Sequence, residues 1–234
     1  MLMLPAIAGA KPKLLDLYCG AGGVCGIPNK SGYSKWFDVT GVDIVPRPNY
    51  PGRFIQADAL DYIAQYGWMY DAIHASPPCE GFSHLTPKKY RGNHINMIPA
   101  TRYFLEALGK PYVIENVANA RHLLREPIML CGSMFGLTVW RHRYFETSPR
   151  ITFASFTCCH DFQPVPVNSS CAQRTARKHE SLEAMQITWD MTRDEVRKSL
   201  PPAYGEWLGE RLFKAVRAAS QIDSPISLVK LAAA

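Results

Sequence analysis

The sequence lacks the long apolar run that a membrane-spanning helix needs. No stretch of its 234 residues approaches about 20 consecutive apolar residues. Residues 1–10 are apolar, but no basic region precedes them and the run is short for a signal peptide. No internal repeat is visible. We therefore expect a protein that has no membrane partner and that stays in the cytoplasm.

A disulfide framework is also missing. The seven cysteines form an odd, scattered set, which favours a reducing compartment. No paired Cys-x-x-Cys pattern occurs, and we assign no metal ligands. Zinc on Cys158, Cys159, His160 and Cys171 stays open as an alternative to ordinary, partly buried thiols.

What the chain does have is enough apolar sequence for a sizeable core. Hydrophobic residues make up 47% of the sequence and charged residues 20%, which argues against disorder. The formal net charge of +6 allows a polyanionic partner but does not require one. The length fits one domain with at most a small appendage.

Short apolar runs alternate with segments of helical spacing along the first two thirds of the chain. Strands are predicted at residues 14–18, 39–44, 54–57, 70–75, 112–114, 128–130 and 144–147. Helices are predicted at residues 31–37, 60–65, 97–109 and 203–219, and order is expected to return at 182–187 and 192–200 after an irregular stretch. This rhythm predicts an α/β fold with a mostly parallel sheet and helices on both faces.

Residues that could bind a ligand or take part in catalysis follow several of these strands. A glycine-rich turn, residues 19–23, follows the first strand, and such a turn lets the backbone approach a nucleotide. Asp43 and Asp58 end the next two strands. The Asp43 carboxylate can bind ribose hydroxyls or simply cap a helix or turn. Glu115 ends the fifth. Because ligands bind at the carboxyl ends of strands in open α/β sheets, we expect these groups to converge.

The stiff segment Ser76-Pro77-Pro78 delivers Cys79 at the same edge, because proline fixes its own φ and restricts the residue before it. A thiolate held this way can add to an electron-poor carbon, and a nearby carboxyl group such as Glu115 can protonate a ring nitrogen. The alternative is that Cys79 is a structural cysteine in a proline-rich turn. With Arg141 and Arg143, these groups fit covalent activation of a pyrimidine ring followed by group transfer.

In family order, these motifs resemble those of the DNA (cytosine-5) methyltransferases, especially the compact kind found in bacteriophage genomes. The similar stretches are Asp16 to Gly23, Gly41-Val42-Asp43, Asp58, Ser76 to Cys79 with Phe82-Ser83, Glu115-Asn116-Val117, Arg141-His142-Arg143, and Ala203-Tyr204 with Gly209. The resemblance covers residues 13–147 and 181–217. It implies a Rossmann-like S-adenosylmethionine-dependent methyltransferase fold. It also implies a monomeric protein that acts on double-stranded DNA, in the host cytoplasm if the gene is carried by a phage.

The resemblance also implies roles for individual residues. The catalytic set is Cys79, Glu115, Arg141 and Arg143. The S-adenosylmethionine set is Asp16, Tyr18, Cys19, Gly20, Ala21, Gly22, Gly23, Asp43, Ile44, Asp58, Ala59 and Pro77. The substrate set is Ser83, Lys88, Lys89, Arg91, Asn116, Arg174, Arg177 and Lys178. The target cytosine would be flipped out of the duplex to meet them.

The chain departs from the family pattern at three positions that lie beside these motifs. Glu80 and Val139 stand where the family usually has glutamine, and Glu210 stands where asparagine is usual. The sizeable target-recognition domain of the family is reduced to residues 148–180. We therefore predict a catalytic and cofactor-binding domain at 1–147, a small recognition segment at 148–180, a completing part at 181–219 and a tail at 220–234. Short or relaxed sequence specificity follows as a hypothesis.

Three other functions stay open at this point. The same chemistry on RNA would use the same fold and cysteine motif. A DNA-binding protein without activity would keep the fold, although Cys79 and Glu115 are both present. Transfer of another group from a modified cofactor is also compatible with these motifs.

Overall fold

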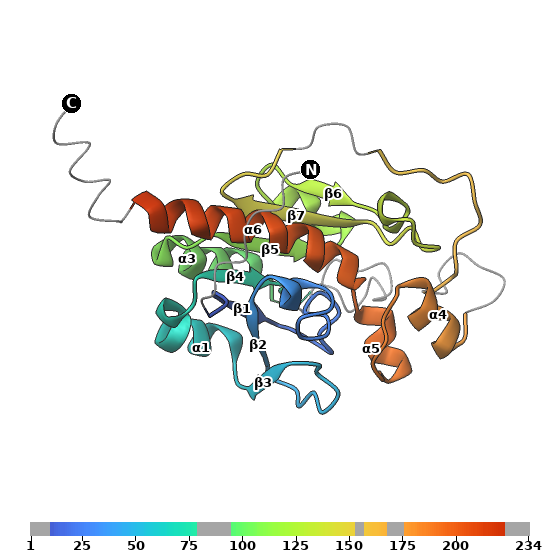
Figure 1. The fold of residues 1–234 in the computed structure, drawn as a ribbon, viewed down its shortest axis with the longest axis horizontal. Coiled ribbons are helices and arrows are strands. Elements are labelled where there is room, and N and C mark those ends of the chain that lie inside the picture. The colour runs from blue at the N-terminus through green and yellow to red at the C-terminus, as the bar shows by residue number, and fades with distance from the viewer. Residues whose placement is uncertain (1–9, 79–94, 153–156, 168–175, 223–234) are drawn as a thin grey trace.

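The structure, a computed structural model, describes residues 10–78, 95–152, 157–167 and 176–222. Its centre is a seven-stranded sheet with the order β3-β2-β1-β4-β5-β7-β6 (Figure 1). The strands are β1 Lys13–Leu17, β2 Asp38–Asp43, β3 Arg53–Gln56, β4 Ala72–Ala75, β5 Tyr112–Asn116, β6 Ile128–Leu130 and β7 Arg143–Ser148. All seven predicted strands are therefore present. No helix in the described ranges is both long and apolar enough to cross a membrane.

Strands β1 to β5 are parallel, and β7 runs antiparallel between β5 and β6. This order, with its reversed seventh strand, is the arrangement of the Rossmann-like S-adenosylmethionine-dependent methyltransferase fold and confirms the predicted fold class. The reversal has a consequence for the site. It places the start of β7 beside the end of β5, with Glu115 opposite Phe145 and Asn116 opposite Tyr144.

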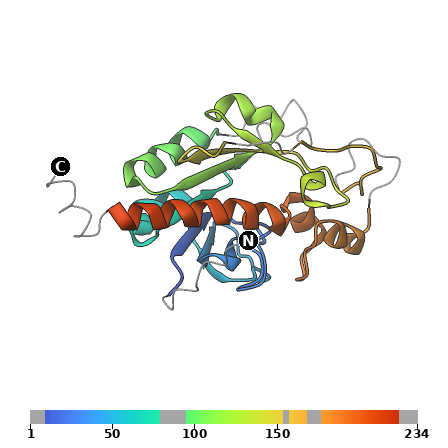
Figure 2. The same ribbon diagram turned by 45° about the horizontal axis from the view of Figure 1, so that its top comes forward.

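The helices form layers on both faces of the sheet (Figures 1 and 2). Their bounds are α1 Ala59–Tyr66, α3 Ile98–Leu108, α4 Lys178–Ala184, α5 Arg193–Lys198 and α6 Pro202–Ile222, with short 3-10 turns η1 Tyr33–Lys35, η2 Gly67–Met69, η3 Ala118–Leu123 and η4 Gly132–Phe135. One core cluster joins α6 and η1 to the sheet, and a second joins α1, α3 and η3 to its other face. Side chains alternate between these faces along each strand, so Leu14 belongs to the first cluster and Leu15 to the second.

The predicted helix at residues 31–37 is wrong. Only the 3-10 turn η1 forms there, because Asn29 and Gly32 adopt positive φ values of 62° and 62° that interrupt regular helix. Helix α4 begins before residue 182, where order was expected to return. Its N-terminus is closed by the Glu180 carboxylate, which accepts from the Arg177 N–H at 2.7 Å. Helix α6 begins at Pro202. The first N–H groups of a helix have no partner within the helix, so proline, which lacks an N–H, costs no hydrogen bond at this position.

A buried ion pair fixes the relation of α3 to β7. Nε and Nη2 of Arg102 donate to the two carboxylate oxygens of Glu146 at 2.8 and 2.6 Å. The Tyr112 hydroxyl and the Arg125 N–H donate to the same carboxylate at 3.2 and 2.8 Å. A buried charge needs such partners, so this network holds the far end of β7 rigidly in the sheet.

Candidate active site at the carboxyl edge of the sheet

The turn after β1 has the backbone form of a cofactor cradle. Tyr18, Gly20 and Gly22 have φ values of 55°, 51° and 78°, a region that tyrosine rarely adopts. The Cys19 N–H donates to the Val42 carbonyl at 3.1 Å and ties the turn to β2. A Cβ added to Gly20 would meet nothing within 4 Å, so the space above this glycine is open. The predicted glycine turn therefore has room for a ligand against its backbone.

Asp43 links this turn to the end of β2. Its carboxylate accepts from the Gly20 N–H and the Val45 N–H, both at 2.9 Å, and pairs with Arg47 at 3.3 Å. A carboxylate can accept about four hydrogen bonds, so it keeps capacity for a further donor such as a hydroxyl. The neighbouring Ile44 is 66% exposed. A carboxylate beside an uncovered apolar side chain fits a ribose and its attached base.

Asp58 acts as a helix cap. Its Oδ1 accepts from the N–H groups of Leu60 and Asp61 at 2.8 and 3.1 Å and closes the N-terminus of α1. Ala59, the first residue of that helix, is buried. This capping role of Asp58 was not predicted, and its contact to a cofactor base stays a prediction.

Asp16 supports the turn from within the sheet. The side chain is 1% exposed, and its Oδ2 accepts from the Tyr50 hydroxyl at 3.2 Å, whereas its Oδ1 has no hydrogen-bond partner in the described ranges. Tyr50 can reach it because Gly41 has no side chain: a Cβ there would lie 2.3 Å from the Tyr50 ring. Burial raises the pKa of Asp16 to about 7.

Residues from the end of the chain close the turn, and sequence reasoning missed two of them. The Trp189 indole N–H donates to the Ala21 carbonyl at 3.1 Å. A Cβ on Gly23 would lie 2.4 Å from the Leu200 carbonyl oxygen, so glycine is needed for this close approach. The loops that flank α5 therefore pack against the turn.

The proline arm after β4 is fixed by the end of β5. The Asn116 amide donates to the Pro77 carbonyl at 3.0 Å, and its Oδ1 accepts from the Val117 N–H at 2.9 Å. Asn116 is 1% exposed, so it supports the proline arm from within, and its predicted contact with the substrate stays a prediction. The arm it holds leads directly into Cys79, which lies outside the described residues.

Glu115 lies at the end of β5 and is 7% exposed. Burial raises its pKa, against the opposing effects of the Arg143 charge, a hydrogen bond from Ser76 and the Arg141 charge. Nε of Arg143 lies 3.1 Å from its Oε1 but is not aligned to donate, so this oxygen keeps its capacity to bind another group. The result is a carboxyl group that takes up a proton more readily than usual beside a fixed cation.

A hydrogen-bonded chain that the sequence did not indicate orients Glu115. The Tyr33 hydroxyl lies 2.9 Å from Nδ1 of His74, and Nε2 of His74 lies 3.0 Å from the Ser76 hydroxyl. Burial lowers the pKa of His74 to about 3, so the ring is neutral and one nitrogen donates while the other accepts. If Tyr33 donates to His74, His74 to Ser76 and Ser76 to Glu115, every group is satisfied.

The two predicted arginines have different surroundings. Arg143 opens β7 and faces Glu115. Arg141, with a positive φ of 39°, donates from Nη2 to the Arg197 carbonyl at 2.7 Å, and its own carbonyl accepts from the Tyr204 hydroxyl at 2.9 Å. Arg143 therefore faces Glu115 directly, whereas Arg141 adds its charge to the site and connects it to α5 and α6.

Few of the predicted substrate residues can be placed. Arg177 and Lys178 are exposed, and Lys178 pairs with Asp190 at 2.7 Å, which offsets part of its charge. The remaining predictions outside the described residues are Cys79, Ser83, Lys88, Lys89, Arg91 and Arg174.

The cysteines of the turn are not rival nucleophiles. Cys19 and Cys25 are buried, and burial raises the pKa of both thiols, that of Cys25 to about 12. A thiol attacks as its thiolate, so neither is reactive near neutral pH. Of the four residues considered for zinc, Cys158 and His160 lie together, Cys159 is exposed apart from them, and Cys171 lies outside the described residues.

No protein-family model matches the chain, and no curated protein matches it. Among solved structures, the methyltransferase EhMeth of Entamoeba histolytica aligns with 68% of this chain and 59% of its own, at 16% identity and a TM-score of 0.44. This chain thus spans less than two thirds of that protein. A conserved hypothetical protein of Streptococcus pyogenes aligns with 62% of this chain and 92% of its own, at 12% identity and a TM-score of 0.33.

A third similar structure is a 1,6-didemethyltoxoflavin-N1-methyltransferase of Burkholderia thailandensis, solved with S-adenosylhomocysteine. It aligns with 58% of this chain and 54% of its own, at 14% identity and a TM-score of 0.24. At these identities and TM-scores the similarities assign no family, and the site is interpreted from its own geometry.

Proposed function

We propose that the chain is a DNA (cytosine-5) methyltransferase that uses S-adenosylmethionine. One observation carries the proposal. Two neighbouring residues at the end of β5 serve the two halves of the reaction, since Glu115 is buried against Arg143 while Asn116 binds the Pro77 carbonyl just before Cys79. An acid and a nucleophile would thus be held at a fixed separation by one strand.

The cofactor end of the site supports the same proposal. Open space above Gly20, the remaining capacity of Asp43 and the exposed side chain of Ile44 fit the amino acid, ribose and adenine parts of S-adenosylmethionine. The cofactor would supply an electrophilic methyl group. The turn would hold it at the edge of the sheet where β4 leads into Cys79.

On the substrate, Cys79 would add to ring position 6 of a flipped cytosine, forming a carbon–sulfur bond. Glu115 would give its proton to ring nitrogen 3, which takes up the electron pair displaced by this addition. Its raised pKa favours the protonated form that this role needs. After methylation at position 5, loss of the proton there to a base would expel the Cys79 thiolate, and return of the nitrogen 3 proton to Glu115 would restore the neutral ring and the acid.

Arg143 would fix the base during these steps. Its guanidinium lies beside Glu115 and presents donors that suit the carbonyl oxygen of the pyrimidine or a nearby phosphate. The net charge of +6 is compatible with a nucleic acid as the substrate. Because only residues 148–180 separate the arginine motif from the C-terminal part, we propose short or relaxed sequence specificity.

The test is methyl transfer from labelled S-adenosylmethionine to DNA, RNA and free nucleotide in parallel. We expect label at position 5 of cytosine in DNA, lost in Cys79→Ser and kept in Cys159→Ser, a matched change at an exposed cysteine. Label in RNA alone would favour the RNA alternative, and no transfer to any acceptor would favour a binding protein. Transfer that survives Cys79→Ser would refute the mechanism.

Specificity is measured by bisulfite sequencing of DNA methylated to completion. We expect methylation in many short sequence contexts. A single long recognition sequence would contradict the proposal of relaxed specificity without affecting the chemistry.

A further inference from the structure

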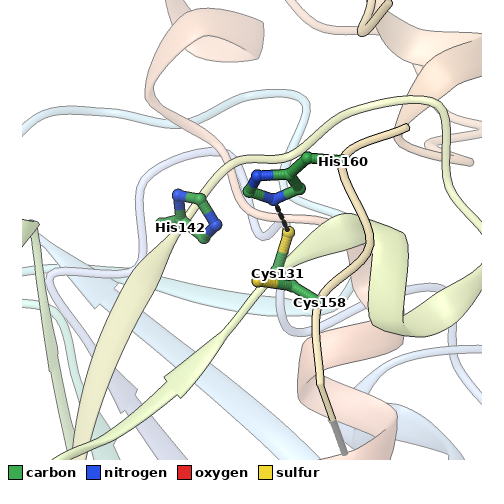
Figure 3. A group of neighbouring side chains, drawn as sticks. All are labelled: Cys131, His142, Cys158 and His160. Atoms are coloured by element: carbon green, nitrogen blue, oxygen red, sulfur yellow. Dashed lines mark hydrogen bonds between the residues drawn. The ribbon is translucent and has the colours of Figure 1, made fainter. Parts of the chain in front are cut away.

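A second group of reactive side chains lies behind the arginines, and the methyl-transfer mechanism does not use it. Cys131 directly follows β6, His142 directly precedes β7, and Cys158 and His160 belong to the segment 157–167 (Figure 3). One ligand atom from each of the four lies within 4.8 Å of every other. Residues far apart in sequence thus present two sulfur and two nitrogen atoms to one point.

One member of the group, His142, has a buried ring nitrogen without an ordinary partner among the described residues. Nε2 of His142 is buried and has no hydrogen-bond partner in the described part of the chain. Cys131 is buried, and its Sγ lies 3.3 Å from Nε2 of His160. A buried imidazole nitrogen without a partner is costly, which indicates that something else normally satisfies it.

The surroundings hold the group in place. The Trp140 ring stacks on His160 with centroids 4.2 Å apart and 18° between the planes. The Ser133 hydroxyl lies 3.2 Å from Sγ of Cys131 and accepts from the Cys159 N–H at 3.1 Å. These contacts orient the sulfur and the ring from outside the group, as supporting residues do around metal ligands.

We propose that Cys131, His142, Cys158 and His160 bind one structural zinc ion. Two thiolates and two imidazoles are a common donor set for zinc, and its bond lengths place tetrahedral ligand atoms about 3.3–3.8 Å apart. A small inward movement from the present separations reaches that geometry. Two thiolates also neutralise the ion, so its charge adds no repulsion to Arg141 and Arg143.

The site is closed, because four protein ligands complete the coordination of zinc. It would therefore act on structure and not as a Lewis acid. The ion would join the end of β6, the start of β7 and the segment 157–167, which contains no helix or strand in its described residues. Since His142 lies between Arg141 and Arg143, zinc would also fix the backbone that presents Arg143 to Glu115.

The test is the metal content of the full chain, purified under reducing conditions without chelator. We expect about one zinc ion per chain by elemental analysis. Because His160 is exposed, its replacement disturbs the packing least. His160→Ala and Cys158→Ser should both lose the metal while circular dichroism shows a folded chain. Cys159→Ser is the matched control, because it changes the adjacent exposed thiol and should keep the zinc.

Cobalt substitution reports the ligands independently of activity. Co²⁺ in place of zinc should give the strong visible absorption of a tetrahedral site and a thiolate charge-transfer band, both absent in Cys158→Ser. The proposal is overturned if the folded chain binds neither zinc nor Co²⁺, if Cys159→Ser loses metal as Cys158→Ser does, or if peptide mapping finds Cys131 and Cys158 joined in a disulfide.

Discussion

Replacing Glu115 with glutamine removes the transferable proton and keeps the shape of the side chain. Glutamine can still accept from Ser76, so the chain of hydrogen bonds through His74 is preserved on that side. General acid catalysis by a positioned side chain contributes typically 10²–10⁴-fold. Because each tenfold change is 1.36 kcal/mol, we expect the barrier to rise by about 3–5 kcal/mol and kcat to fall accordingly.

The assay is single-turnover methyl transfer at saturating DNA and S-adenosylmethionine, which isolates the chemical step from binding. Glu146→Gln is the matched control, since it changes a carboxylate that is also buried near the β5–β7 pairing but is bound by Arg102 away from the site. Loss of one charge from that pair should lower the free energy of unfolding by up to about 3–5 kcal/mol. It should leave kcat close to the original.

Two results would refute this reasoning. Glu115→Gln could keep the original single-turnover rate, which would mean that no proton from Glu115 is needed. Both variants could lose activity equally, which would mean that Glu115 serves the fold and not the reaction.

Three further changes test individual parts of the site. Burial raises the pKa of Asp16 to about 7, so protonated Asp16 stabilises the fold fully below about pH 4, and this stabilisation, about 4 kcal/mol, is lost as the pH rises through 7. In urea unfolding, Asp16→Asn should make the free energy of unfolding depend less on pH. An unchanged pH dependence would contradict this. Asn116→Ala should lower kcat more than it raises KM for DNA, because it releases the Pro77 carbonyl; a change confined to KM would contradict this. In Gly23→Ala the new Cβ would lie 2.4 Å from the Leu200 carbonyl oxygen. This variant should bind the cofactor more weakly in calorimetry and lose about 1–3 kcal/mol of stability. Unaltered binding would contradict the inferred packing of Leu200 against the turn.

The strands were predictable because each is a short apolar run that ends in a glycine, proline or polar residue. The helices were less so. Residues 31–37 have apolar spacing, but Gly26 and Gly32 hold positive φ, and a Cβ added to Gly32 would lie within 3 Å of Cys25 backbone atoms, a restriction that spacing does not reveal. The antiparallel place of β7 between β5 and β6 is likewise a tertiary choice that no local pattern encodes.

The site was predictable where a residue ends a strand, since all parallel strands present their carboxyl ends at one edge. Asp43 and Glu115 could be placed on that ground. His74 and Ser76 could not be assigned to the site, because in the sequence they stand at the end of an apolar run. Only their mutual contact at 3.0 Å shows the chain of hydrogen bonds that leads to Glu115. The metal group was missed for a similar reason. Cys131 and His142 are brought to Cys158 and His160 by strand pairing, whereas sequence proximity favoured Cys159.

The central claim is that Cys79 attacks cytosine while Glu115 protonates it, and trapping the adduct tests it most directly. DNA carrying 5-fluorocytosine is incubated with the enzyme and S-adenosylmethionine, and because fluorine cannot leave as a proton does, the enzyme cannot be released after methylation. The account predicts a complex that survives denaturation, with the DNA attached to Cys79 in peptide mapping, and its slower formation in Glu115→Gln. Attachment at another residue, or methylation of ordinary DNA by an enzyme that forms no such complex, would contradict it.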